Sequence, residues 1–482
     1  MEKHDFSAAL WLADPNDDFE HNGVVGMASF NPRKGTDLEI PLGSIGRSDS
    51  ASFSANYHQK YELLYGVGRR GEYITLVNAL CRSAECSYPG FPRESWRAQE
   101  AIVSHGQPVN PSLHIEKAAV EIDGLLEWCH QNPVKSLTRY DKDIKWLSTE
   151  ISASAEMLDD VPLYESESMK AYLSPVVSVN HGELPLQAQS LTGDYNLSFQ
   201  FSGNLPTLSQ VIYERIIPFR DFLSLLMGFR AEILSISLLS PDVERPVEVY
   251  IPFVEARHCD LSNDAFRHMP FNYPQVRDSL QPMVEKWLSL PGDATRAADI
   301  MLGTLANERS IYPALEFIAA ASAFEALSRI DHKTEELSRE EFDRRLSVVR
   351  RSVLDKNTRD WAVYNLQHSN YVAANELADR MLGELRPYSI FITPDLSRFE
   401  QEHRDARNAY VHRTEEISKG TVLTGRNLST HTNAVLFLVW GKLLNLLGIS
   451  PDSLIEALKS SSFRWSERAE VQHAYSMNGT KV

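Results

Sequence analysis

Four polar side chains in the C-terminal part of the chain have the types that phosphodiester chemistry needs. Arg404, Arg407, Asn408 and His412 fall within one short stretch. A histidine can move a proton to or from a hydroxyl near neutral pH. An arginine can hold a phosphate in a bidentate fork and stabilise charge as it develops. These types suit His412 as general acid or base and Arg407 as phosphate clamp. Asn408 would position the hydroxyl or the imidazole, and Arg404 would add positive charge.

One helix is expected to position these side chains. Thr393-Pro394-Asp395 predicts its start, with threonine as N-cap, proline at the first position and aspartate near the positive end of the dipole. Mostly apolar residues then recur at spacings of three and four, which predicts a buried face: Leu396, Phe399, His403, Ala406 and Tyr410. At about 100° per residue, Arg404, Asn408 and His412 fall together away from this face. Arg407 lies at its border.

The alternative is a solvated helix face with a surface histidine, because an arginine and a histidine five residues apart often occur by chance. On the apolar face we expect His403 to be a packed core residue. We expect Tyr410 to be core rather than a platform for base stacking.

Glu325 stands out because it interrupts the otherwise apolar run Ala323–Leu327. A carboxylate inside an apolar helix is costly unless it is paired. Glu325 therefore either lies on an exposed face, or supports the site by orienting an arginine or histidine of the stretch above.

Composition limits the class of protein. The chain has 482 residues, 43% hydrophobic and 23% charged, which is typical of a globular protein with two or three domains. A net charge of −17 argues against a non-specific nucleic-acid coat but leaves room for an RNA-cutting enzyme with a local cationic site. No apolar run approaches a membrane span, and the first residues lack the apolar segment of a signal peptide. We therefore expect no membrane association.

Cysteine and histidine spacing gives no sign of a metal or a disulfide framework. The four cysteines form no CxxC pair: Cys81, Cys86, Cys129 and Cys259. This usage fits the reducing cytoplasm best. His258-Cys259-Asp260 with His268 matches no standard zinc spacing, and we interpret it as a loop. We expect neither a metal nor another cofactor.

The patterning changes character along the chain. The first half contains short strand-like runs separated by turn residues: 24–31, 37–42, 61–66, 73–79, 114–122, 173–180, 195–201, 231–237 and 247–253. From about Tyr273 the apolar period becomes helical: 276–288, 296–305, 312–329, 339–354, 370–385, the helix described above, 427–447 and a short last helix from Pro451. The sequence thus predicts an α+β multidomain protein, a β-rich half followed by an all-α bundle.

Two local signals refine this organisation. Gly66-Val67-Gly68-Arg69-Arg70-Gly71 matches a dinucleotide-binding pattern, but a strand-like run follows it instead of a helix, so we interpret it as a hairpin turn. Pro291-Gly292-Asp293 is a turn signal and marks the expected joint between domains. We expect domains at residues 1–285 and 290–465, and a polar, frayed tail at 466–482.

The stretch from Arg407 to His412 resembles the Arg-x(4–6)-His motif of the HEPN superfamily, and Asn408 matches the polar residue that often follows the arginine. Other segments resemble the ApeA family of phage-defence proteins, in the family's order: Gly23–Gly43 its opening, Glu72–Leu76 its "vTL" strand, Leu125–Trp128 its "L..W" segment, and Ala323–Leu327 with Arg407–His412 its HEPN domain. Together they span most of the chain.

The resemblance implies an abortive-infection endoribonuclease with a sensing N-terminal half and a HEPN-like helical bundle. In HEPN ribonucleases two such motifs meet across a dimer and cleave RNA without metal. The expected partners are therefore an RNA substrate, with transfer RNA as one candidate, a second copy of the chain or a larger homo-oligomer, and a phage-derived trigger. The alternative is a non-catalytic protein, whose HEPN-like bundle only dimerises and whose N-terminal half binds a ligand.

Overall fold

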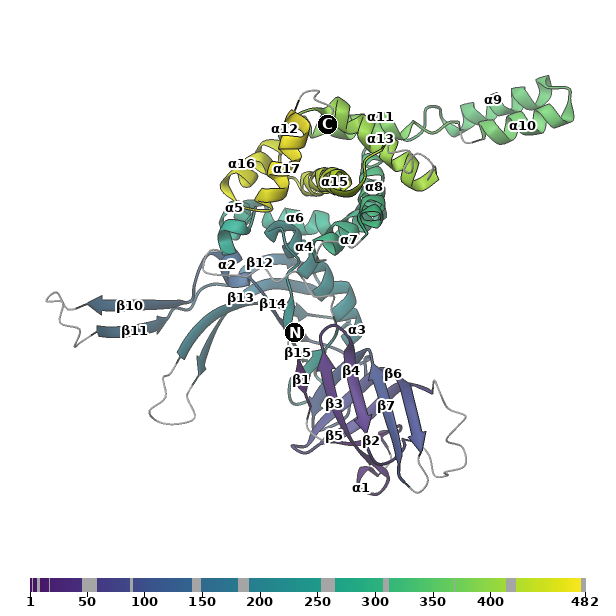
Figure 1. Cartoon of the computed structure of the whole chain (residues 1–482). Helices are drawn as coiled ribbons and strands as arrows, with labels where there is room; N and C mark the ends of the chain where they lie inside the picture. Colours follow the sequence, from purple (N-terminus) through teal and green to yellow (C-terminus); the bar gives the residue numbers. More distant parts are fainter. Residues whose placement is uncertain are drawn as a thin grey trace. The chain divides into compact units, whose positions relative to one another are not determined.

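The computed structural model describes the chain over residues 1, 3–6, 9–16, 18–45, 59–86, 90–140, 149–180, 190–252, 265–306, 312–367, 369–412 and 422–477. It consists of two compact units, Met1–Leu288 and Ser289–Val482 (Figure 1). Pro291–Asp293, the expected joint, lies just beyond this division, at the start of a helix. The first unit is β-rich and the second is helical, so the predicted α+β organisation is confirmed.

Among the described residues of the first unit, six antiparallel strands close into a barrel. Around the ring they follow the order β6-β5-β2-β3-β4-β7, and β7 pairs with β6 again. Their bounds are β2 (Ala9–Leu12), β3 (Val24–Asn31), β4 (Gly35–Ile40), β5 (Lys60–Gly68), β6 (Glu72–Cys86) and β7 (Pro92–Ala98). β1 (His4–Asp5) pairs with β3, and α1 (Phe19–Asn22) lies between β2 and β3. β5 and β6 form a hairpin around Arg69–Gly71, which confirms the hairpin interpretation of the glycine pattern.

The long strand β6 links the barrel to the rest of the sheet. Its first part pairs with β8 (Glu100–His105) and its last part with β7. Between them Asn78 adopts a left-handed φ of 55°, and the register shifts between Cys81 and Ser83. A bulge of this kind bends a strand and lets it change partner.

Beyond β8 the same sheet continues as β8-β16-β15-β9-β14-β13-β12. Its strands are β9 (Lys117–Ile122), β12 (Val161–Glu165), β13 (Met169–Asn180), β14 (Ser190–Phe201), β15 (Ile233–Leu239) and β16 (Val247–Tyr250). α4 (Ile217–Met227) packs on it, with the ring centroids of Phe219 and Phe199 5.2 Å apart. α3 (Leu208–Val211) and a π-helical turn (Ile212–Ile216) lead into α4, which places Pro218 in its first turn.

Smaller elements complete the first unit. α2 (Leu125–Cys129) follows β9, and β10 (Val134–Tyr140) and β11 (Thr149–Ala155) form a separate two-stranded ribbon. α5 (Tyr273–Val276) and α6 (Leu280–Leu288) end the unit, joined by a short 3-10 turn. The described strands β1, β2, β7, β8, β10, β11 and β12 were not among the strand-like runs in the sequence. β7 shows why, because its buried positions alternate and include a carboxylate, Glu94, which a core strand rarely contains.

The second unit is helical throughout its described elements. They are α7 (Gly292–Ala306), α8 (Pro313–Ser328), α9 (Arg339–Ser352), α10 (Lys356–Leu366), α11 (Ala374–Glu384), α12 (Arg386–Ile392), α13 (Leu396–His412), α15 (Gly425–Leu446), α16 (Pro451–Ser460) and α17 (Trp465–Ser476). α8 contacts α7, α11, α13 and α15, and α15 contacts α7, α8, α12, α16 and α17, so these two helices form the centre of the bundle. α15 is buried along most of its length, and its Lys442 forms an ion pair of 2.7 Å with Glu384.

The tail at 466–482 was expected to be polar and frayed, but its described part is folded. α17 covers Trp465–Ser476, and Arg468, Val471 and Tyr475 are buried. The sequence is polar there because only one narrow face packs, on α12 and α15. Within the described residues, no helix is long and apolar enough to cross a membrane.

The packing around Gly441 in α15 predicts that a larger residue at this position destabilises the fold. A Cβ at this position would overlap the ring of Tyr388, which is fully buried and whose hydroxyl donates to the Phe437 carbonyl. We expect Gly441→Ala to lower the free energy of unfolding by about 1–3 kcal/mol, the usual cost of overpacking a core. The measurement is urea unfolding followed by tryptophan fluorescence.

Gly303 in α7 provides the matched control, because a Cβ there meets nothing within 4 Å. Gly303→Ala should stabilise by up to about 1 kcal/mol through helix propensity alone. Equal effects of the two substitutions would show that the packing described around Gly441 is wrong.

Candidate active site around Arg407

The helix that holds the predicted site residues is α13, and two neighbouring helices anchor it. Its start differs from the sequence prediction. Thr393 donates to the Ser389 carbonyl at the end of α12, and Asp395 accepts from the Arg398 backbone N–H at 3.0 Å. The aspartate thus satisfies a free N–H of the first turn. Further along, Ala406 packs into a buried cluster with Phe317 of α8 and Leu428 of α15.

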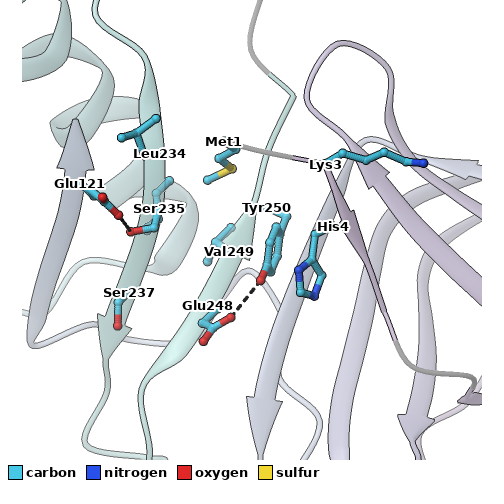
Figure 2. Close-up of a pocket in the computed structure, with 11 residues that line it drawn as sticks. Met1, Lys3, His4, Glu121, Leu234, Ser235, Ser237, Glu248, Val249 and Tyr250 are labelled. Atoms are coloured by element: carbon cyan, nitrogen blue, oxygen red, sulfur yellow. Dashed lines mark hydrogen bonds between the residues drawn. The ribbon is translucent and has the colours of Figure 1, made fainter. Parts of the chain in front are cut away.

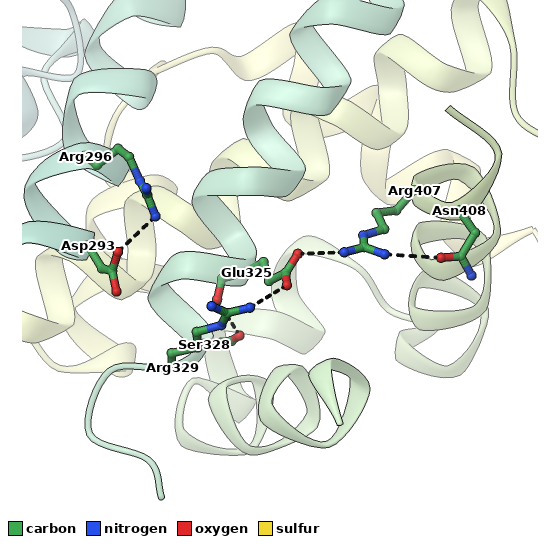
Figure 3. Close-up of polar contacts among 7 residues, drawn as sticks. All are labelled: Asp293, Arg296, Glu325, Ser328, Arg329, Arg407 and Asn408. Carbon is green, nitrogen blue, oxygen red and sulfur yellow. Dashed lines mark hydrogen bonds and ion pairs between the residues drawn. The ribbon is translucent and has the colours of Figure 1, made fainter. Parts of the chain in front are cut away.

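Arg407 is joined directly to α8, one of the two central helices of the bundle. Its Nη2 donates to Oε2 of Glu325 on α8 at 3.2 Å, and its Nη1 donates to Oδ1 of Asn408 at 3.4 Å (Figure 3). The Arg407 side chain is 36% exposed and the Glu325 side chain 27% exposed. The guanidinium is therefore held from one side while part of it still reaches solvent.

Glu325 divides its two oxygens between two arginines. Oε1 accepts from Arg329 at 2.8 Å, one turn along α8, and Oε2 accepts from Arg407. This contact favours the positioning interpretation of Glu325 over the exposed-face alternative. A guanidinium carries five N–H donors. Arg407 uses two of them in its contacts with described residues, so the others can bind a phosphate.

The structure says less about Arg404, His412 and Arg413. Arg404 is half exposed, and its Nε lies 3.8 Å from the Asp405 carboxylate, a weak surface contact. His412 is the last residue of α13, about 7.5 Å along the helix axis from Arg407. The His412 side chain and the whole of Arg413 lie outside the described residues. The structure thus brings Arg407, Asn408 and Glu325 together and leaves the position of the His412 imidazole open.

Behind Arg407 lies a buried polar chain that the sequence did not reveal. His403 Nδ1 is 3.3 Å from Nε2 of His431 on α15, and His431 Nδ1 is 2.6 Å from the Tyr475 hydroxyl on α17. That hydroxyl donates to Oε2 of Glu402 at 3.1 Å, back on α13. We call His403, His431, Tyr475 and Glu402 the histidine chain. His403 is thus half-buried among aromatic rings, as expected, but it is also hydrogen-bonded.

Both imidazoles of the histidine chain are neutral at physiological pH. Burial and, to a smaller extent, the Arg407 charge together lower the pKa of His403 to about 4, against an opposing effect of Glu325. Burial and His403 also lower the pKa of His431. The Tyr475 hydroxyl donates its hydrogen bond to Glu402, so His431 must donate from Nδ1 to that hydroxyl and accept at Nε2. His403 then donates from Nδ1, and its Nε2 keeps its lone pair.

No group of three or more histidine, cysteine, aspartate or glutamate side chains that could hold a metal occurs in the described ranges. His258, Cys259 and Asp260 fall outside those ranges. His268 is the last residue of a short 3-10 helix (Ala265–His268).

In the first unit, a pocket of about 430 Å³ opens where β15 and β16 diverge (Figure 2). Its carboxylates Glu121 and Glu248 accept from Ser235 and Tyr250.

Two family models match the chain. One, described as "ApeA N-terminal domain 1", matches residues 7–287, and the other, described as "Apea-like HEPN", matches residues 318–453. The second match contains both Glu325 and the stretch from Arg407 to His412. No curated protein and no solved structure matches the chain.

The lowered pKa of His403 predicts how stability depends on pH. In the unfolded chain this histidine titrates near 6.5, but in the fold only near 4. The contribution of the neutral, buried His403 to the free energy of unfolding is therefore complete above about pH 6.5. It is lost as the pH falls towards 4, because the unfolded state takes up the proton first. Between about pH 7.5 and pH 5, His403 should account for about 2 kcal/mol of lost unfolding free energy.

Urea unfolding at both pH values measures this loss in the wild type and in His403→Gln, which should show the smaller pH dependence. His21→Gln is the control, because the His21 side chain is 78% exposed. An identical pH dependence in His403→Gln and the wild type would contradict the described burial.

Proposed function

The chain belongs to the ApeA family, and from that membership we propose that it is a metal-independent HEPN endoribonuclease acting in abortive-infection defence against phage. The observation that supports this most is the held guanidinium of Arg407. Glu325 and Asn408 fix it on the helix that ends at His412. A preorganised cation near a histidine is what phosphoryl-transfer chemistry requires in the absence of a metal.

Each residue has a defined role in this proposal. His412 acts as general acid or base on the RNA 2′-hydroxyl, and Arg407 binds the phosphate and stabilises its developing charge. Asn408 positions the hydroxyl or the imidazole, besides its contact with Arg407. Arg404 adds positive charge, and Glu325 orients Arg407. The 2′-oxygen attacks the phosphorus and displaces the 5′-oxygen of the next nucleotide, so that one product ends in a 2′,3′-cyclic phosphate and the other in a protonated 5′-hydroxyl.

One arginine and one histidine make a sparse active site, so we propose that two copies of α13 share it in a homodimer. Arg404, Arg407 and Arg413 from both copies would give RNA a local cationic cleft on a chain of net charge −17. The N-terminal unit would sense a phage-derived trigger, and the pocket between β15 and β16 is a site of suitable volume for a ligand. Transfer RNA remains one candidate substrate.

A second function is supported by the same contact. The ion pair between Arg407 and Glu325 could be purely structural, in a HEPN-like bundle that dimerises without cleaving RNA while the N-terminal unit binds a ligand. The two proposals differ in one respect that can be measured directly, which is whether RNA cleavage depends on His412.

We expect His412→Ala to lower the rate of RNA cleavage by about 10²–10⁴, the range for a lost general acid or base. Arg407→Ala should have a comparable effect, and Arg407→Lys should recover only part of the activity, because an ammonium cannot form the bidentate fork. Cleavage should persist in EDTA. The measurement is the initial rate on labelled RNA, with the mass of each variant followed by light scattering.

Matched controls exist for both side chains. Arg296→Ala removes another arginine–carboxylate pair of the helical unit, that with Asp293 (Figure 3), and His473→Ala removes an exposed histidine of α17. Neither should alter the rate. Full activity in His412→Ala, or activity lost in EDTA and restored by a divalent ion, would overturn the nuclease proposal. A stable, fully active monomer would overturn the shared site.

A further inference from the structure

Two helices of the second unit pack chiefly on each other. α9 and α10 form an antiparallel hairpin that runs away from the other helices of this unit (Figure 1). We call residues 339–366 the arm. Of its side chains, only Leu346 is fully buried. The arm therefore presents most of its side chains to solvent, where they are available to bind a partner.

The exposed face of α9 is cationic rather than apolar. Val348 is 52% exposed and lies between Arg344 and Arg351 at spacings of four and three, so the three side chains share one face. A second copy of the arm would need a continuous apolar seam at this spacing to pair with it. The arginines interrupt that seam, which disfavours an interface between copies.

The net charge of the arm is opposite in sign to that of the rest of the chain. Residues 339–366 contain seven basic and five acidic side chains, so the arm carries +2 and the remainder −19. Four of its cations have no acidic partner among the described residues: Arg339, Arg350, Arg351 and Lys356. Three of these, Arg350, Arg351 and Lys356, gather where the hairpin turns. A polyanion repelled by most of this protein would be attracted there.

The arm also exposes large aromatic side chains. Trp361 is 67% exposed and Tyr364 is 71% exposed, three residues apart on α10. Neither ring contacts another ring or a cation in the described part of the chain. Exposed aromatic rings and cations on the same segment are the combination with which proteins stack unpaired bases and neutralise phosphates.

We propose that the arm binds unpaired nucleotides of RNA. Arg350, Arg351 and Lys356 contact the phosphates, and Trp361 and Tyr364 stack on bases. The proposal rests on the proposed function for the identity of the polyanion. It concerns binding alone, so it can fail or hold independently of cleavage. The arm extends the RNA footprint well beyond the small cationic area around Arg407.

The test measures RNA binding by the full-length His412→Ala protein, with a fluorescein-labelled single-stranded RNA and fluorescence anisotropy. The triple variant Arg350→Gln/Arg351→Gln/Lys356→Gln should bind at least about tenfold more weakly at low salt. Its slope of log affinity against log salt should be shallower by about 2, because three phosphate contacts on a single strand release about 0.7 counterion each. Trp361→Ala/Tyr364→Ala should bind at least about fivefold more weakly with an unchanged slope.

The control is Lys34→Gln/Arg69→Gln/Arg70→Gln, which removes three charges from exposed turns of the barrel. This control variant should bind the RNA nearly as tightly as the His412→Ala protein without further changes. Equal losses in the control and the arm variants, or arm variants that bind normally, would overturn the proposal. A halved molecular mass in light scattering of the arm variants would also overturn it and assign the arm to contacts between copies.

The two proposals fail separately. If the catalytically intact protein cleaves RNA and the arm variants bind normally, only the arm is wrong. If the arm variants lose affinity as expected while His412→Ala retains full cleavage, the arm stands and the catalytic assignment is wrong.

Discussion

The ion pair between Glu325 and Arg407 is the constraint on which the candidate site depends. A carboxylate in the otherwise apolar run Ala323–Leu327 must find a partner, and α13 provides one at 3.2 Å. The partner is itself held by the helix that carries the proposed general acid or base. Because Glu325 also accepts from Arg329, two arginines hold its carboxylate. In the proposed nuclease the guanidinium would therefore need little reorganisation to bind a phosphate, and such preorganisation is a main source of electrostatic catalysis.

The histidine chain keeps α13 in the position that this ion pair requires. It joins three helices through side chains that cannot easily change charge. Burial holds both imidazoles neutral, and burial with the nearby Glu402 raises the pKa of the Tyr475 hydroxyl. A protonated His403 would place a second cation beside Arg407, and the two positive charges would repel each other. The last helix, α17, is therefore part of the support of the site, through Tyr475 and through the Arg398 contact with the Ala474 carbonyl.

The spacing of apolar residues predicted the strands in which buried and exposed residues alternate, and the helices in which buried residues recur every three or four positions. Val24–Asn31 matches β3, and the helix of Arg407 was expected almost at its observed bounds. The failures have physical causes. β7 buries Glu94, whose carboxylate accepts from Trp96 two residues along the strand, and from Ser44 and Ile45, which are 50 and 49 residues away in sequence. His431 and Tyr475 meet only in the fold, 44 residues apart, so no local pattern could pair them. The sequence left open whether Glu325 lies on an exposed face or orients an arginine or histidine. The residues around a single glutamate in a helix do not show which other helix packs against it.

The central claim is that the RNA itself supplies the nucleophile while Arg407 and His412 act on the phosphate. The most direct measurement uses an RNA that the protein cleaves at a mapped position, resynthesised with a single 2′-deoxynucleotide immediately 5′ of that phosphodiester. The account predicts that cleavage disappears at this position, continues at neighbouring sites, and leaves a 2′,3′-cyclic phosphate wherever it occurs. Cleavage at an unchanged rate beside the deoxynucleotide would contradict it, because the attacking hydroxyl would then have to come from water.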